Sequence, residues 1–112
     1  MTQRRSGIIP ILVWALALFF AGAYAVAAGQ RSLVDQGSKL FIEQGCYGCH
    51  TVGKMGSPIG PDLSRVGSRY PQSYLLQWLR DPASVKLTAH MPKIALTEEE
   101  VQALAAYLAS LR

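Results

Sequence analysis

The sequence is poor in the side chains that build metal sites and disulfide frameworks. Its 112 residues include two cysteines and two histidines. A structural zinc site needs four ligands, and the available ones are Cys46, Cys49, His50 and His90. Because Cys49 and His50 are adjacent, they would have to bind one ion together, which is an awkward geometry. Neither a zinc site nor a simple disulfide is a good explanation of these residues.

Charge is scarce too, and it is nearly balanced outside the N-terminal region. From Gln30 onward, nine basic residues stand against seven acidic ones. The basic residues are spread through the chain and form no stripe of the kind that binds nucleic acid. We therefore expect no nucleic-acid partner, and a solvated surface is the expected place for most of these charges.

The longest stretch without any charge runs from Ile8 to Ala28. As a helix, its 21 residues would span about 30 Å, the hydrocarbon thickness of a bilayer. A pair of arginines precedes the stretch, and positive charge favours the cytoplasmic side. We expect residues 1–29 to form a cytoplasmic leader and a single-pass anchor in the cytoplasmic membrane. Residues 30–112 then form one small domain on the periplasmic or extracytoplasmic side.

A cleaved signal peptide is the alternative for the same stretch. Its start is positive, and small residues recur near its end, at Ala21, Ala23, Ala25, Ala27 and Ala28. However, the apolar run is longer than the 7–15 residues of an ordinary signal-peptide core. A retained anchor is the preferred interpretation.

The chemistry of the chain is concentrated in Cys46-Tyr47-Gly48-Cys49-His50. Two thiols three positions apart, followed directly by an imidazole, are typical of covalent c-type haem attachment. The thiols of Cys46 and Cys49 would add to the two vinyl groups of one haem c, and His50 would bind the iron. A redox dithiol of the thioredoxin kind would need a βαβ surrounding, and no alternating β-branched run flanks the motif.

Apolar spacing predicts three helices in the domain, over residues 33–44, 72–80 and 98–111. Gly45 ends the first, and Thr97 with Glu100 forms a capping box at the start of the last. Gly29 to Ser32 is expected to be a short polar join. Loops are expected over residues 51–60 and, as irregular chain, over residues 83–90.

From about Asp35 to the end, the sequence resembles the class I mono-haem cytochromes c. The matching parts are the haem motif, a capped terminal helix, and the residues Gly37, Phe41, Gly60-Pro61-Asp62-Leu63, Met91-Pro92 and Tyr107. The resemblance implies an all-α class I cytochrome c fold, here with one N-terminal transmembrane helix. In that family the first and last helices cross near such a glycine and pack an aromatic pair. Residues 60–70 also look like the membrane-anchored mono-haem subunit of cbb-type haem–copper oxidases.

The resemblance also implies the iron ligands, His50 on one face and Met91 on the other. Met1 lies before the apolar stretch, and Met55 is close to His50 in sequence, which leaves Met91 as the natural candidate. His90 is its local competitor. A His/Met pair raises the reduction potential and closes both axial positions.

The family resemblance also implies further contacts to the haem or its ligands, at the positions in this sequence that match the family. The Pro61 carbonyl is expected to fix the second ring nitrogen of His50, as ligating histidines generally require. Arg69, Tyr70 and Trp78 are candidate donors to the haem propionates. For Trp78, an ordinary core residue with a bonded N–H is an equally good interpretation.

The function implied is electron transfer in a respiratory or photosynthetic chain, and not catalysis by the chain alone. Expected partners are redox proteins or subunits of a membrane respiratory complex, with no small-molecule substrate. The short join slightly favours a fixed subunit over a tethered carrier, and Lys54, Lys86 and Lys93 are candidates for a docking rim. The alternative is a haem sensor or small peroxidase with an open distal iron position.

Overall fold

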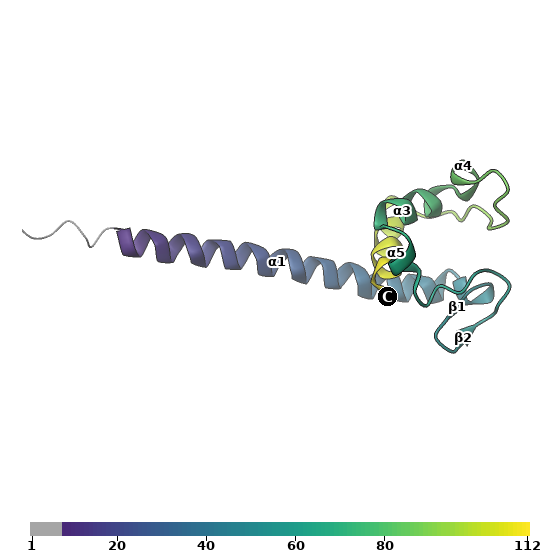
Figure 1. Ribbon diagram of the computed structural model, residues 1–112, viewed down its shortest axis with the longest axis horizontal. Coiled ribbons are helices and arrows are strands. Elements are labelled where there is room, and N and C mark those ends of the chain that lie inside the picture. The colour runs from purple at the N-terminus through teal and green to yellow at the C-terminus, as the bar shows by residue number, and fades with distance from the viewer. Residues whose placement is uncertain (1–7) are drawn as a thin grey trace, which may run out of the picture. The chain divides into compact units, whose positions relative to one another are not determined.

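A computed structural model describes residues 8–112 of the chain (Figure 1). The described chain is mostly helical, as expected, with one very short strand pair. In order, its elements are α1 (Ile8–Glu43), the 3-10 turn η1 (Cys46–Gly48), β1 (Thr51–Val52), β2 (Met55–Gly56), α2 (Val66–Arg69), α3 (Gln72–Arg80), α4 (Pro82–Val85) and α5 (Glu98–Ser110). The expected leader before Ile8 lies outside the described residues.

The chain divides into two compact units between Arg31 and Ser32. In the first unit, the described residues belong to α1, which is long and apolar enough to cross a membrane by length and composition. Its large apolar side chains are exposed, including Trp14 at 71% and Tyr24 at 77%. An exposed apolar surface of this extent is what a membrane or a partner protein covers.

The structure corrects the expected join at Gly29 to Ser32, because these residues are helical and belong to α1. A single glycine inside a helix costs only about 1 kcal/mol relative to alanine, and no proline interrupts the segment. The apolar stretch and the expected helix over residues 33–44 are therefore one element. It ends at Glu43, followed by Gly45 in the left-handed conformation (φ 72°).

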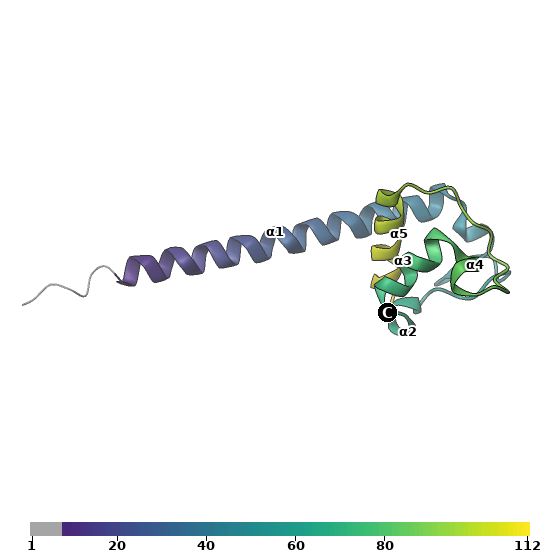
Figure 2. The ribbon, with the colours of Figure 1, turned by 90° about the horizontal axis from the view of Figure 1, so that it is seen from above.

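The second unit is organised around the crossing of α5 with the C-terminal part of α1 (Figure 2). Gly37 is buried at this crossing, and a Cβ there would overlap the Ala103 carbonyl and lie 2.6 Å from the Tyr107 Cβ. Phe41 is 2% exposed and packs edge-on against Tyr107, with ring centroids 5.6 Å apart. The glycine crossing and the aromatic pair are confirmed.

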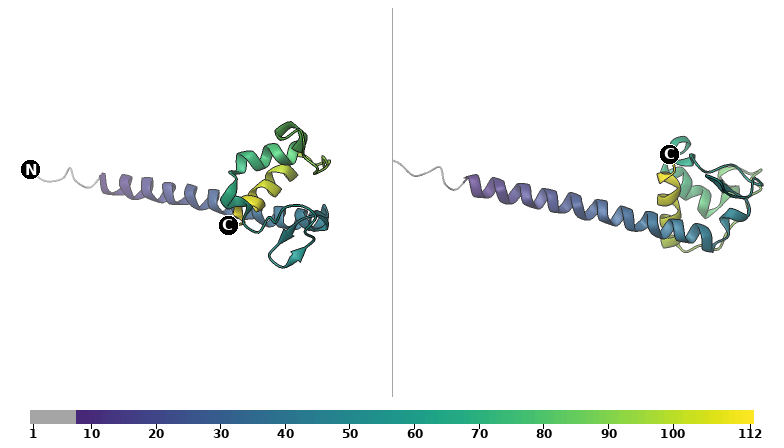
Figure 3. Two further views of the ribbon diagram at one scale, coloured as in Figure 1. Left: turned by 45° about the vertical axis from the view of Figure 1, so that its right-hand side comes forward. Right: turned by 90° about the horizontal axis from the view of Figure 1, so that it is seen from below.

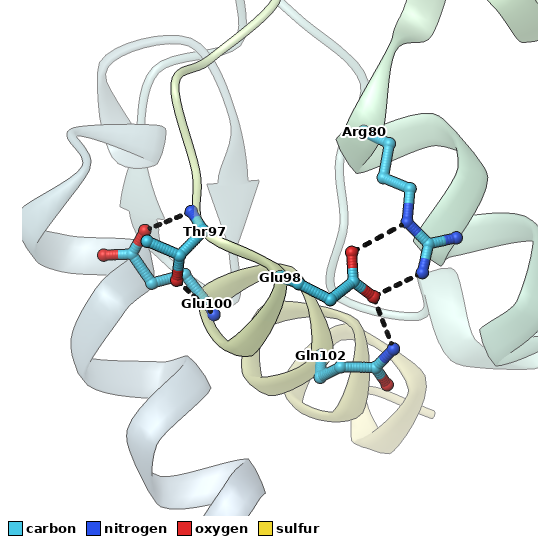
Figure 4. A network of polar contacts seen from close by, with 5 residues as sticks. All are labelled: Arg80, Thr97, Glu98, Glu100 and Gln102. Atoms are coloured by element: carbon cyan, nitrogen blue, oxygen red, sulfur yellow. Dashed lines mark hydrogen bonds and ion pairs between the residues drawn. The ribbon is translucent and has the colours of Figure 1, made fainter.

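Helices α2 and α3 pack against α5 and complete the core (Figure 3). Helices α1, α2, α3 and α5 all contribute to one buried apolar cluster. Its members are Phe41, Val66, Leu75, Leu79, Val101, Leu104, Ala105 and Leu108. The capping box at Thr97 and Glu100 is present, and Arg80 of α3 pairs with Glu98 at the start of α5 (Figure 4). Helix α3 has the expected bounds.

Three short elements were not expected. Residues 51–56 form a hairpin instead of a loop, since Gly53 supplies the positive φ of a two-residue turn. Residues 83–85 belong to α4 instead of irregular chain, because Asp81 caps the Ala83 N–H and Pro82 occupies the first helical position. Helix α2 is too short to have a periodic signal.

Candidate haem site

The two cysteines lie on and just after the turn η1, which follows Gly45. Both thiols are free, with Cys46 partly buried and Cys49 exposed. Between them, Tyr47 packs edge-on against Phe41 with ring centroids 4.8 Å apart, so the turn is held against the core. Burial raises the pKa of the Cys46 thiol, whereas dithiol oxidoreductases depend on a lowered thiol pKa. The site therefore does not favour a redox dithiol.

His50 follows the turn, and its ring is fixed by the backbone of a distant segment. Its Nδ1 lies 2.8 Å from the Pro61 carbonyl oxygen. A carbonyl oxygen can only accept, so Nδ1 carries the proton and Nε2 carries the lone pair. In this tautomer Nε2 is free to bind a metal while Nδ1–H is bonded to a carbonyl, which is the usual arrangement of a metal-binding histidine.

The segment that carries Pro61 is held by Asp62. The Asp62 carboxylate accepts from the Ser64 hydroxyl at 2.6 Å and from the Thr51 hydroxyl at 3.1 Å, which ties the segment to β1. These hydrogen bonds hold the pKa of the Asp62 carboxyl below its usual range, and those from Ser64 have the largest effect. The bond from Arg69 Nη2 to the Asp62 carbonyl, at 2.6 Å, secures the same residue from α2.

The backbone at Gly60 lies close to the His50 ring, near its Cε1 and Nδ1 atoms. A Cβ at this position would lie 2.7 Å from Cε1 and 2.9 Å from Nδ1 of His50. Glycine therefore allows the Pro61 carbonyl to reach the imidazole. The Gly60 N–H also donates to the Cys49 carbonyl, which closes the loop onto the haem motif.

Met91 lies in the chain between α4 and α5 and is partly buried. Its Sδ accepts a hydrogen bond from the Trp78 indole Nε1–H at 3.2 Å. An ion pair from Lys93 to Asp81, at 3.7 Å, ties the same loop to the start of α4. His90, the competitor for the distal position, is exposed.

The remaining predicted donors have other contacts in the structure. Arg69 uses Nη2 on the Asp62 carbonyl, as described above. Tyr70 is 41% exposed, and its ring stacks on Tyr74 with centroids 4.6 Å apart. Tyr74 in turn stacks on Trp78 at 6.2 Å. Sequence analysis did not anticipate this ladder. The i, i+4 spacing of Tyr74 and Trp78 on α3 was a usable signal, but Tyr70 lies before the helix in extended backbone and had none.

The residues present suit a covalent haem. In Figure 1 the β1–β2 hairpin, which follows the haem motif in the chain, and α4, which precedes the Met91 loop, both lie to the right of α5, one below and one above it. A neutral imidazole and a thioether are the donor set of a cytochrome iron. Among residues 8–112, no group of three His, Cys, Asp or Glu side chains is placed to hold a metal ion.

The Cytochrome c family model matches residues 34–112. The chain belongs to the cytochrome c family. Two curated relatives of this cytochrome c are both called cytochrome c oxidase subunit 2. One is from Alkalihalophilus pseudofirmus, 38% identical over 91 residues, covering 73% of this chain and 27% of the relative. The other is from Bacillus sp. strain PS3, 34% identical over 95 residues, covering 71% of this chain and 26% of the relative.

Membership of the family confirms several expectations at a general level. A cytochrome c domain implies covalently bound haem c and haem-based electron transfer, and the spacing of Cys46, Cys49 and His50 agrees with it. The cytochrome c spans about a quarter of the length of these relatives.

Proposed function

We propose that the protein is a membrane-anchored electron-transfer cytochrome with one haem c, held by Cys46 and Cys49 and ligated by His50 and Met91. The observation that carries the proposal is the bond between His50 Nδ1 and the Pro61 carbonyl. It prepares Nε2 as a ligand next to two free thiols. A haem bound here supplies a one-electron couple at its iron.

The residues of the chain account for the other requirements of electron transfer. The thiols fix the cofactor covalently, so the haem is not lost during repeated oxidation and reduction. His50 and Met91 would hold the haem iron, and an iron held by both donors would transfer electrons without binding a substrate. We propose no catalysis by this chain alone, although it can serve as a subunit of a larger oxidoreductase.

The distal ligand is tested by substituting Met91 with alanine. An absorption band near 695 nm in the oxidised protein is the family's marker for an iron–Met bond. We expect the band in the unaltered protein and its loss in Met91→Ala. A band that survives the substitution would refute the ligand. Binding of carbon monoxide by the reduced, unaltered protein at neutral pH would instead support a sensor or small peroxidase with an open position.

We further propose that the protein works as a subunit of a terminal oxidase complex. The support is the likeness to two proteins called cytochrome c oxidase subunit 2, together with the long apolar helix. In this arrangement residues 1–29 form the leader and anchor, and residues 30–112 present the haem on the extracytoplasmic side. Purification in mild detergent should recover the chain together with larger haem or copper subunits. Migration as a lone small cytochrome would favour a tethered carrier.

A further inference from the structure

The bond between Trp78 and Met91 brings a side-chain donor to the sulfur that we propose as the distal iron ligand. The indole Nε1 of Trp78 lies 3.2 Å from Met91 Sδ, and the pair is partly buried. Trp78 is on α3, whereas Met91 is 13 residues further along the chain in a loop. The contact is therefore tertiary, and it reaches across from the helix to the loop.

The indole of Trp78 belongs to an aromatic ladder with Tyr74 on the same helix and with Tyr70, which lies just before that helix. Tyr70 and Tyr74 are nearly parallel, at 14°, and Tyr74 and Trp78 are inclined by 24°. Tyr74 and Trp78 are one helical turn apart on α3, whereas Tyr70 precedes the helix in extended backbone and stacks on the Tyr74 ring. Stacking of this kind restricts rotation of the Trp78 side chain and keeps its N–H directed at the Met91 loop.

A thioether sulfur has two lone pairs and no hydrogen to donate. If one lone pair accepts from Trp78, the other remains for the iron. The hydrogen bond withdraws electron density from the sulfur and makes it a weaker donor to the oxidised iron. Bonds to a ligand from residues that do not touch the metal are an established means of tuning a haem.

We propose that Trp78 is a positioning residue for Met91. Its indole N–H, oriented by the stack with Tyr74 and Tyr70, donates to Sδ, selects the lone pair that faces the iron, and raises the reduction potential of the site. This inference rests on the proposed ligation by Met91. It differs from the role expected for Trp78 from the family, in which the N–H bonds a haem propionate.

The two roles are separated by a double-mutant cycle. Trp78→Phe keeps an aromatic ring in the stack and removes the N–H, and Met91→His keeps an axial ligand and removes the sulfur. With Met91 in place, Trp78→Phe should raise the ratio of oxidised to reduced protein roughly threefold at a fixed solution potential. This change corresponds to a fall of about 30 mV in the reduction potential of the one-electron couple. In the Met91→His background the same substitution should leave the potential unchanged, because the acceptor is gone.

An equal shift in both backgrounds would overturn the proposal and assign the N–H to a propionate. No shift in either background would also overturn it. The matched control is Trp14→Phe, at the chain's other tryptophan, which lies in the first unit and should not change the potential. Failure of the underlying function is recognised separately, since the unaltered protein would then lack the 695 nm band.

A second measurement needs no substitution of Trp78 and covers the case in which Trp78→Phe does not fold. Exchange of the indole N–H with deuterium is followed by NMR in the reduced protein. We expect faster exchange in Met91→His than in the unaltered protein, because the bond to sulfur protects the N–H. Equal exchange rates would contradict the bond.

Discussion

At the scale of single residues, the proximal side of the site depends on one backbone carbonyl reaching one imidazole. His50 follows the haem motif in sequence, but its tautomer is determined by Pro61, eleven residues further on. Gly60 and Asp62, on either side of Pro61, provide the space and the tether for that contact. Changes at these neighbours should therefore disturb the haem site although neither residue is a ligand.

Substitution of Gly60 with alanine tests the space above the imidazole. The new Cβ would lie 2.7 Å from His50 Cε1, so the ring or the loop must shift. We expect a lower yield of covalent haem and a loss of about 1–3 kcal/mol in the free energy of unfolding. Haem content per chain and urea unfolding measure the two effects. Gly29→Ala is the control, since a Cβ there meets nothing within 4 Å and the residue lies outside the unit that carries the haem motif. An equal effect of both would argue against the steric cause.

A second prediction at the scale of single residues concerns how the stability of the fold changes at acid pH. Bonds from the Arg80 guanidinium, and then from the Gln102 amide, lower the pKa of the Glu98 carboxyl from 4.5 to about 2 (Figure 4). Because the folded-state pKa is the lower one, the contribution to stability is complete above about pH 4.5 and is lost as the pH falls to about 2.

The measurement is the urea midpoint at several pH values for the unaltered protein and for Glu98→Gln. The difference between them should shrink as the pH falls from 5 to 2.5 and should weaken with added salt, because the pair is exposed. Glu99→Gln, which removes a carboxylate from the same turn, is the control. A difference that does not change with pH would show that the ion pair is not the cause.

At the scale of elements, the fold depends on the close crossing of α1 and α5. Sequence spacing predicted that Gly37 and Phe41 share a face, and the structure places both against α5. The short elements around the site depend instead on turn residues such as Gly53 and Asp81, whose conformations have no periodic signal. For this reason the longer helices α3 and α5 were predictable, whereas the hairpin, α2 and α4 were not.

Gly37→Ala is expected to separate the two helices. Its Cβ would overlap the Ala103 carbonyl, and backbone cannot move aside as a flexible side chain can. We expect a loss of about 1–3 kcal/mol or more in the free energy of unfolding.

The matched control is Gly29→Ala on the same helix, where a Cβ meets nothing within 4 Å. A Gly→Ala change inside a helix is itself worth up to about 1 kcal/mol of stabilisation. The two variants should therefore shift the thermal midpoint in opposite directions. A shift in the same direction would indicate that helix propensity, and not the crossing, governs Gly37.

At the scale of the whole molecule, the prediction is that one chain keeps both its apolar segment and its haem. The denatured protein isolated from membranes should have the mass of the full chain plus one haem. It should leave the membrane with detergent and not with salt, because its apolar helix side chains are exposed. A mass lacking about the first 25–30 residues, the length of a signal peptide, would contradict the anchor. Loss of the haem mass in a Cys46→Ser, Cys49→Ser double variant checks the attachment.

The amino-acid sequence by itself determined the haem motif, the apolar stretch and the helices over residues 72–80 and close to 98–111, because each depends on local spacing or composition. The crossing near Gly37 and the Phe41–Tyr107 pair were expected from the family resemblance, and the structure shows them. The tertiary structure decided what acts on those residues from a distance. It showed the Pro61 carbonyl at His50, where the sequence pointed only by family resemblance. It also placed the Trp78 N–H on Met91 Sδ, where the expectation had been either a haem propionate, by family resemblance, or an unnamed partner in the core. Contacts between residues far apart in the chain have no local signature, so only the folded backbone could reveal them.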